Sequence, residues 1–378
     1  MREAPIADDL WIANGGVGFR YLGMRKHTTF LVVAALFAAF AFTSNLQAQP
    51  LVSIETVTVG DPGNAADTTG YGAVSNVFAI GKYEVTIGQY TTFLNSVAAS
   101  DPYFLYKTDM GTNLTIAGIV RSGSEGSYTY SVLDPSGLTP PGASSGANRP
   151  ISFVSWFNAA RFANWMHNGA IVGASTETGA YTLNGAIYGT NFTRNLDATW
   201  WIPAESEWYK AAYYKGGGTN AGYWIYPTQS DFQPSNDIES PEGVNHANYR
   251  EGAAYNQSPQ DGVGVFAVTQ LSDYDPSQNY LTDIGVFSNS GGAYGTFDQG
   301  GGVFEWNEEI FGGGRGIRGG SATLGGDYLM STTREMVSTP ALHNQHTGFR
   351  LATVPEPSTY ALLLMTGAGA LWLARRRR

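Results

Sequence analysis

Glycine is spread along the whole chain and accounts for 48 of its 378 residues, while cysteine is absent. Glycine at this density favours turns, loops and short strands over long helices, because its backbone adopts conformations that are closed to other residues. Aromatic residues make up 13% of the chain and supply bulky apolar surface for a core. We therefore expect an irregular globular domain, stabilised by burial alone or by burial and a metal, without disulfides.

An export signal is predicted near the N-terminus. The basic pair Arg25 and Lys26 precedes an apolar run at 30–42 and a small-residue cleavage site at 46–48. Met24 stands directly before the basic pair. We therefore expect residues 1–23 to be a mis-assigned translation start and residues 24–48 to be a signal peptide; a long genuine leader is the alternative.

The C-terminus has a second hydrophobic signal. Pro-Glu-Pro at 355–357 precedes an apolar segment at 360–374 and four arginines at 375–378. At 1.5 Å per residue this segment spans about 22 Å, less than the roughly 30 Å core of a bilayer. The whole tail, 354–378, resembles the PEP-CTERM sorting signal, which an exosortase recognises and is thought to cut. The resemblance implies transient inner-membrane contact through 360–374 and export to the cell surface or extracellular matrix; a plain membrane anchor is the alternative.

The central region is strongly acidic. Eight of the 21 basic residues, but only four of the 31 acidic ones, lie in the two terminal segments, which leaves the centre near a net charge of −14. Such a domain repels nucleic acid and anionic membranes and attracts cations. We therefore exclude nucleic acid as a partner. The lack of cysteine also excludes a thiol nucleophile and thiolate metal ligands.

One domain, residues 51–353, is predicted between the two signals. A helix begins at Thr86, where Gln89 completes a capping box; a second begins at Ser155, and a third runs from Pro203 to the glycines at 216–218. Short strands are predicted at 223–226, 283–287, 303–306 and 316–318, and a loop at 136–150. The pattern predicts an α+β domain with a few peripheral helices and short, irregular antiparallel strands.

Six motifs follow one another over about 270 residues. They are Gly-Lys-Tyr-Glu-Val-Thr at 81–86, Arg-Pro-Ile at 149–151, Trp-Ile-Pro-Ala-Glu-Ser-Glu-Trp at 201–208, Phe-Asp-Gln-Gly-Gly-Gly-Val-Phe-Glu-Trp at 297–306, Arg-Gly-Gly-Ser at 318–321 and Gly-Phe-Arg-Leu-Ala at 348–352. In this order they resemble the formylglycine-generating enzyme (sulfatase-modifying factor) family. The resemblance implies a decorated C-type-lectin-like fold that is low in regular secondary structure.

The chain departs from that family at the catalytic position. In true formylglycine generators, a cysteine pair between the last two motifs binds copper. Here the stretch 322–347 has Leu324, Leu329, Met330 and Ser331 where such residues would fall. Cysteine-dependent formylglycine generation is therefore excluded. Iron-dependent relatives take their histidine ligands largely from an extra helical domain, which this chain lacks.

The segment 298–306 is the strongest candidate for a metal site. Its three glycines allow the backbone to turn inward, so that the carbonyls of Gly301 and Val303 join the Asp298 carboxylate around Ca²⁺. The family's calcium site uses this segment in the same way, although Gly302 stands where the family usually has Asn. The alternative is a glycine turn in which Asp298 only caps backbone N–H groups.

A second calcium site is expected from the resemblance alone. Asn248 and Tyr249 match the start of another family calcium site, and Asp275 is a trial assignment for its acidic ligand. His343 and His346 are three residues apart and would need a nearby acid to form an iron triad of two histidines and one carboxylate. The segment 341–347 is expected to be a loop without such an acid.

Two functions are compatible with these features. The leading hypothesis is a non-catalytic, calcium-braced domain that binds extracellular polysaccharide or a surface protein. The alternative is a mononuclear non-haem iron oxidoreductase of the same superfamily that uses His343 and His346. The aromatic residues that do not fill the core would form a sugar-stacking surface in the first case.

Overall fold

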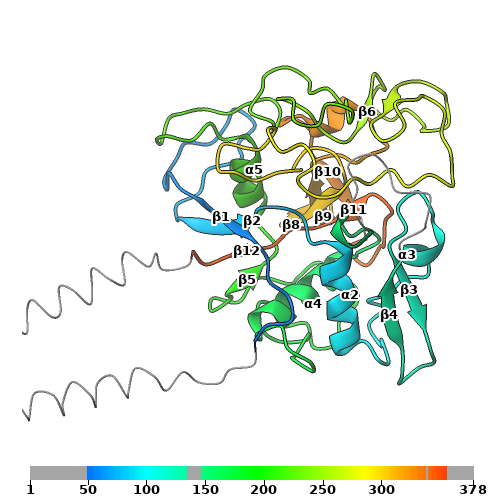
Figure 1. Ribbon diagram of the computed structural model, residues 1–378. Helices are drawn as coiled ribbons and strands as arrows, with labels where there is room; N and C mark the ends of the chain where they lie inside the picture. The colour runs from blue at the N-terminus through cyan, green and yellow to red at the C-terminus, as the bar shows by residue number, and fades with distance from the viewer. Residues whose placement is uncertain (1–48, 134–145, 338, 356–378) are drawn as a thin grey trace, which may run out of the picture. The chain divides into compact units, whose positions relative to one another are not determined.

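The computed structural model describes residues 49–133, 146–337 and 339–355 (Figure 1). The signal segments predicted at 1–48, the sorting tail beyond residue 355 and most of the loop 136–150 lie outside the described residues. Among the residues that are described, no helix is long and apolar enough to cross a membrane.

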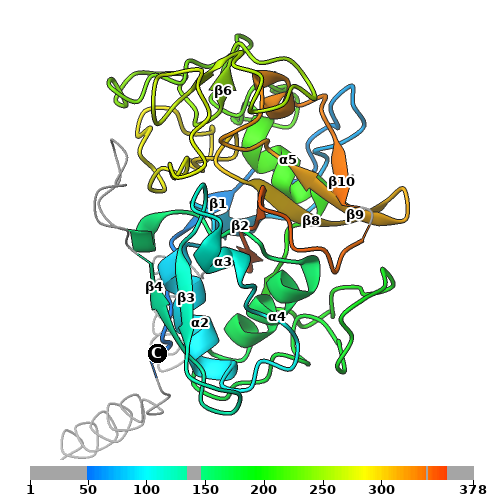
Figure 2. The same ribbon diagram turned by 90° about the vertical axis from the view of Figure 1, so that its right-hand side faces the viewer.

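Two capped helices form one side of the core, α2 (Ile87–Val97) and α4 (Trp156–His167), which lie side by side (Figure 2). The capping box predicted for α2 is confirmed: Thr86 Oγ1 accepts a hydrogen bond from Gln89 N (3.2 Å), and Gln89 Oε1 accepts one from Thr86 N (2.9 Å). Ser155 caps α4 through its side chain. Eleven of the 12 residues of α4 are buried, so this helix belongs to the core rather than to its edge.

The third helix is shorter than predicted. α5 comprises Glu205–Tyr213 and does not extend from Pro203 to the glycines at 216–218. It ends because Tyr214 adopts an extended backbone (φ −67°, ψ 137°) and pairs with Tyr223 in an isolated bridge. Three short elements have no signal in the sequence pattern: the single-turn helix α3 (Asp109–Thr112) and the 3₁₀ turns η1 (Gly146–Asn148) and η2 (Gly326–Leu329).

Two four-stranded sheets connect distant parts of the chain. The first has the order β1 (Thr56–Val59), β2 (Phe78–Gly81), β12 (Ala352–Thr353), β5 (Trp200–Trp201). The second has the order β10 (Glu335–Val337), β9 (Gly314–Arg318), β8 (Phe304–Phe311), β11 (Thr347–Gly348). Two hairpins complete the set, β3 (Ile119–Ser122) with β4 (Thr129–Val132) and β6 (Arg250–Glu251) with β7 (Val265–Phe266). All these pairs are antiparallel except β11 with β8.

The strand predictions were half correct. Those at 303–306 and 316–318 are confirmed within β8 and β9. Those at 223–226 and 283–287 are wrong, since the first contains only isolated bridges and the second is a loop. The backbone of the second segment bonds elsewhere: Ile284 N donates to Asn148 O (3.0 Å) and Gly285 N to the Asp298 carboxylate (2.5 Å).

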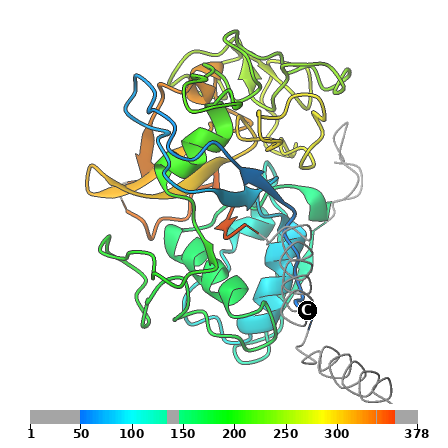
Figure 3. The same cartoon turned by 90° about the vertical axis from the view of Figure 1, so that its left-hand side faces the viewer.

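Aromatic side chains fill the core beside α2 and α4. The ring of Phe162 lies 5.2 Å from that of Phe93, 5.6 Å from Trp165 and 5.4 Å from Phe349. All four residues are fully buried. The long loops between residues 216 and 300 gather beside α5, on the side away from these helices (Figures 1 and 3). Those loops and the adjoining ends of β2 and β8 enclose the first candidate site.

Candidate functional site

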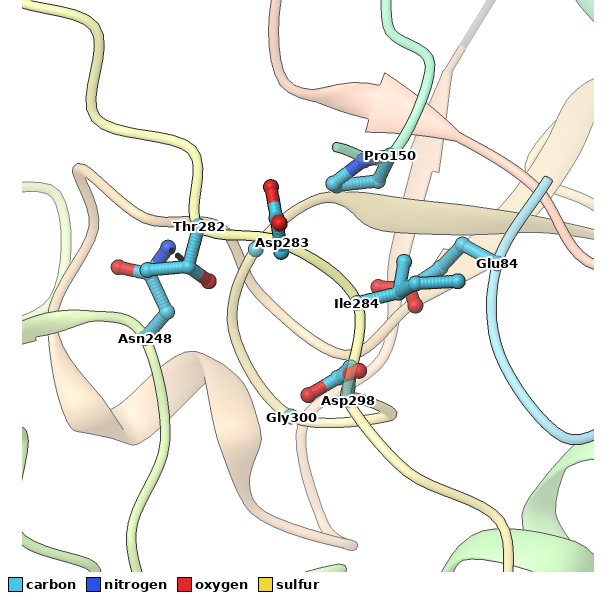
Figure 4. A pocket seen from close by; sticks show the side chains of 9 residues that line it. Glu84, Pro150, Asn248, Thr282, Asp283, Ile284, Asp298 and Gly300 are labelled. Carbon is cyan, nitrogen blue, oxygen red and sulfur yellow. Dashed lines mark hydrogen bonds between the residues drawn. The ribbon is translucent and has the colours of Figure 1, made fainter. Parts of the chain in front are cut away.

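A small cavity of about 10 Å³ lies where five chain segments meet (Figure 4). Glu84 reaches it from the segment after β2, Asn248 from the loop before β6, and Asp298 from the turn before β8. Thr282 and Asp283 close another side. This volume admits about one water-sized occupant. The cavity therefore has room for a single ion or water and for no larger ligand.

The carboxylates around the cavity outnumber their nearest cation. Arg350 makes a bidentate pair with Glu305 (2.6 and 2.7 Å), while its Nη2 is 3.7 Å from Glu84 Oε2. The Glu84 side chain is 1% exposed, and within the described residues neither of its oxygens accepts a hydrogen bond. One guanidinium thus faces Glu305, Glu84 and Asp298 together.

Burial and mutual repulsion perturb both of the less well paired acids. Burial, followed by the charge of Asp298, raises the pKa of Glu84 well above its ordinary value. Burial likewise raises the pKa of Asp298 to about 6, against the hydrogen bond from Gly285 and the charge of Arg350. These shifts mean that the cavity favours protons or a cation over two bare carboxylates.

One residue from each of the two calcium sites expected from the sequence lines this cavity. Asn248 and Asp298 line the same cavity, and Asn248 pairs with Gly301 in a parallel bridge. Gly301 has φ 90°, and a Cβ there would lie 2.1 Å from Asn248 O, so only glycine fits. Asp298 also has a left-handed backbone, with φ 60°. The glycine turn therefore serves close contact between two backbone segments.

Other predicted ligands lie elsewhere. Gly301 and Val303, whose backbone carbonyls were the predicted ligands, are not among the residues that line the cavity. The Tyr249 hydroxyl accepts a hydrogen bond from Gln233 Nε2 (3.1 Å) and donates to Pro234 O. Asp275 is exposed and caps Ser277, so the trial assignment of Asp275 to this site finds no contact to support it.

The two candidate iron ligands contact different partners. His343 Nε2 lies 3.0 Å from Asn158 Nδ2 and 3.1 Å from Phe104 O. His346 Nδ1 lies 3.2 Å from Ser321 Oγ. Burial lowers the pKa of each histidine to about 4, so both are neutral at neutral pH. In the part of the chain that the structure describes, no three His, Cys, Asp or Glu side chains are grouped to hold a metal.

A larger cleft of about 280 Å³ opens beside the second sheet. Phe304, Ile317 and Val337 from its strands form one wall, and the stretch 322–347 contributes Leu324, Tyr328, Leu342, Asn344 and His346. This is the stretch in which true formylglycine generators would have their cysteine pair. The sequence drew attention to this stretch only because the cysteine pair is missing there, and it did not predict the cleft.

Both polar and apolar residues line the cleft. Glu335 lines it and accepts a hydrogen bond from the Tyr255 hydroxyl (2.5 Å). The Tyr255 ring stacks on Tyr328 with the centroids 4.6 Å apart and remains 48% exposed. Leu342, 49% exposed, lies on the wall, and neutral His346 adds an imidazole. The cleft thus offers a carboxylate and an imidazole beside apolar surface, but no thiol.

The charged residues of the shared motifs serve the fold. Arg318 pairs with Glu205 (2.7 Å), joining 318–321 to 201–208, and both side chains are 1% exposed. Arg350 and Glu305 join the last motif to 297–306 in the same way. Trp208 Nε1 donates to Glu305 Oε2 (2.8 Å). The sequence did not predict these pairs, because each joins motifs that lie far apart in the chain.

Comparison with known proteins agrees with the motifs. The family model of the sulfatase-modifying factor enzyme 1-like domain matches residues 52–354, and that of the PEP-CTERM protein-sorting motif matches 353–378. No curated protein sequence matches the chain. The fold and the sorting tail predicted from the sequence are thereby confirmed.

Three solved structures resemble the chain at low identity. The crystal structure of CarF has 17% identity and a TM-score of 0.42, and the match covers 81% of this chain and all of CarF. Treponema denticola variable protein 1 has 17% identity and a TM-score of 0.43, with 80% and 96% covered. PvdO from Pseudomonas aeruginosa has 16% identity and a TM-score of 0.37, with 80% and 93% covered.

Proposed function

The chain belongs to the sulfatase-modifying factor enzyme 1-like family, and we propose that it is an exported, non-catalytic binding domain for extracellular polysaccharide. The PEP-CTERM tail marks it as exported and envelope-associated and implies processing by an exosortase. After processing, the domain would reside at the cell surface or in the extracellular matrix. A surface protein is the other ligand that the sequence leaves open.

The cleft beside the second sheet is the observation that carries this proposal. Its volume of about 280 Å³ lies near the lower end of the ~300–1,000 Å³ range of small-ligand pockets. A sugar ring presents apolar C–H faces and hydroxyl edges, which match the Leu342 wall and the polar groups of Glu335 and His346. In the family position that carries catalytic cysteines, this chain has ligand-binding surface instead.

A bound cation would brace the irregular half of the domain. The orphaned oxygens of Glu84 and the raised pKa of Asp298 describe a cavity that accepts a positive charge. Glu84, Asp298 and neutral oxygens near Asn248 would supply the hard donors that Ca²⁺ prefers. Calcium there would offset the charge of two desolvated carboxylates and link three loops that have little regular structure.

Titration calorimetry of the processed chain, with soluble fragments of the producer's own extracellular polysaccharide, tests the proposal. We expect saturable binding that weakens about tenfold in Glu335→Gln, since a hydrogen bond to a charged group is lost. The substituted amide still accepts from Tyr255, so folding is retained. Glu309→Gln, on the exposed part of β8, is the matched control and should bind like the wild type. Absence of binding, or equal binding by Glu335→Gln, would refute the assignment.

A further inference from the structure

A second and larger hollow, of about 450 Å³, lies between the loop 100–108 and the β3–β4 hairpin. It shares no lining residue with the cleft or with the small cavity. Phe104, Tyr106 and Lys107 line one side, while Arg121 and Tyr128 line the other. The motifs of the sequence do not include any of these residues.

The loop is fixed in shape by a buried carboxylate. Asp101, whose side chain is 2% exposed, accepts hydrogen bonds from Leu105 N (2.7 Å) and Tyr106 N (3.1 Å). Asp101 and Phe104 both have left-handed backbones, with φ 46° and 55°, a conformation that Asp tolerates but that is unfavourable for a bulky residue such as Phe. This arrangement leaves Phe104 53% exposed. The loop therefore presents an aromatic ring to solvent.

Two cations lie over the aromatic rings of the hollow. The guanidinium of Arg121 is 4.2 Å from the ring centroid of Tyr128 and 4.8 Å from that of Tyr106. Lys107 Nζ is 5.5 Å from the Phe104 centroid. Contact with ring faces orients a planar guanidinium while leaving its edge for a ligand. The Arg121 side chain is 30% exposed, so a solute has access to it.

Two acids, Asp101 and Glu125, line the hollow together with the two cations. The closest contact of Arg121 to a carboxylate is 3.7 Å, to Asp101, whose oxygens already accept two backbone hydrogen bonds. Glu125 also lines the hollow but lies exposed in the turn between β3 and β4. Arg121 and Lys107, beside the exposed ring of Phe104, are the cations that line this hollow in a domain with an excess of acidic residues.

We propose that this hollow binds a uronic acid unit of an acidic polysaccharide. Arg121 and Lys107 would hold the sugar carboxylate by charge-assisted hydrogen bonds, and the exposed ring of Phe104 would cover a C–H face of the sugar. Because the domain as a whole repels polyanions, local cations are what would allow an acidic chain to approach. The site is independent of the cleft and of the function proposed for it.

The test titrates the processed chain with a trimer of galacturonic acid and, in parallel, with a trimer of galactose. We expect binding of the acidic trimer only, weakened by added salt and about tenfold or more by Arg121→Gln. Lys107→Gln should weaken it also. The matched control is Lys215→Gln, since Lys215 likewise lies over an aromatic ring, 4.1 Å from the Trp224 centroid, but outside the hollow.

Two further variants keep the result interpretable. Phe104→Ser removes an exposed ring, so it should reduce binding without lowering the melting temperature. This variant therefore tests the site even if Arg121→Gln does not fold. Glu335→Gln in the cleft should leave binding of the acidic trimer unchanged, which separates this site from the cleft. Equal affinity for both trimers, or full affinity in folded Arg121→Gln, would overturn the proposal.

Discussion

Replacing Asp298 by Asn tests two separate effects of its buried carboxylate. One is the folding stability that is lost by burying the charge, and the other is the contribution of the carboxylate to cation binding. Asn tolerates the left-handed backbone at this position, and its amide oxygen still accepts the hydrogen bond from Gly285 N. Only the charge changes. The variant should therefore fold, and any effect on stability will report the electrostatics of the cavity.

The magnitude follows from the pKa of Asp298, which burial raises from 3.8 to about 6. Between these values the folded chain binds more protons than the unfolded chain, so stability falls as the pH rises through this window. At neutral pH the cost reaches at most about 3 kcal/mol. Without calcium, Asp298→Asn should therefore melt higher than the wild type at pH 7, by up to roughly 6–12 °C.

Calcium should reverse this order. A ligand present at about 100 times its Kd stabilises the folded state by about 2.7 kcal/mol, and Asp298→Asn should forfeit most of this gain. Thermal melts in chelator and in excess calcium measure both effects, with exposed Asp275→Asn as the control. The reasoning is refuted if Asp298→Asn melts lower than the wild type by the same amount in both buffers.

Three other changes test the packing and the electrostatics. Gly301→Ala places a Cβ 2.1 Å from Asn248 O at a left-handed position and should cost about 3 kcal/mol or more in urea unfolding; a loss below about 1 kcal/mol would contradict the close contact. Arg350→Met leaves the Glu305 carboxylate buried without its partner and should lower the free energy of unfolding by about 3–5 kcal/mol in the same assay. An unchanged urea midpoint would contradict this expectation. The pKa of His346 is lowered from 6.5 to about 4, so the unfolded chain binds more protons than the folded chain in this window and the free energy of unfolding falls as the pH drops through it. Between pH 7 and 4, the free energy of unfolding of His346→Gln should therefore fall by up to about 3 kcal/mol less than that of the wild type. The same pH dependence in both proteins would argue against the shift.

Local signals in the sequence predicted the helix starts but not every helix end. Thr86 with Gln89, and Ser155, cap their helices through contacts within four residues, which a sequence pattern reveals directly. α5 ends early because Tyr214 pairs with Tyr223, and the segment 283–287 is a loop because its N–H groups bond to Asn148 and Asp298. Those partners are brought together only by the folded chain.

The candidate site was likewise predicted in part. Asp298 was identified because it precedes three glycines, and Asn248 because of its family resemblance, but the sequence placed them in two sites rather than one cavity. Glu84 received no role, since nothing in the segment 81–86 indicates that its carboxylate would be buried without a hydrogen bond. The cleft also depends on strands paired across the second sheet, which no local pattern encodes.

Binding of extracellular polysaccharide in the cleft can be observed in a crystal structure of the processed chain. The crystals are soaked with oligosaccharides from the producer's extracellular polysaccharide in the presence of calcium. We expect a sugar ring in the cleft, with its hydroxyls bonded to Glu335 or His346 and its apolar face against Leu342. Density for an intact sugar there would establish a binding domain. A cleft that stays free of sugar at saturating concentration, or that holds a chemically altered product, would contradict it.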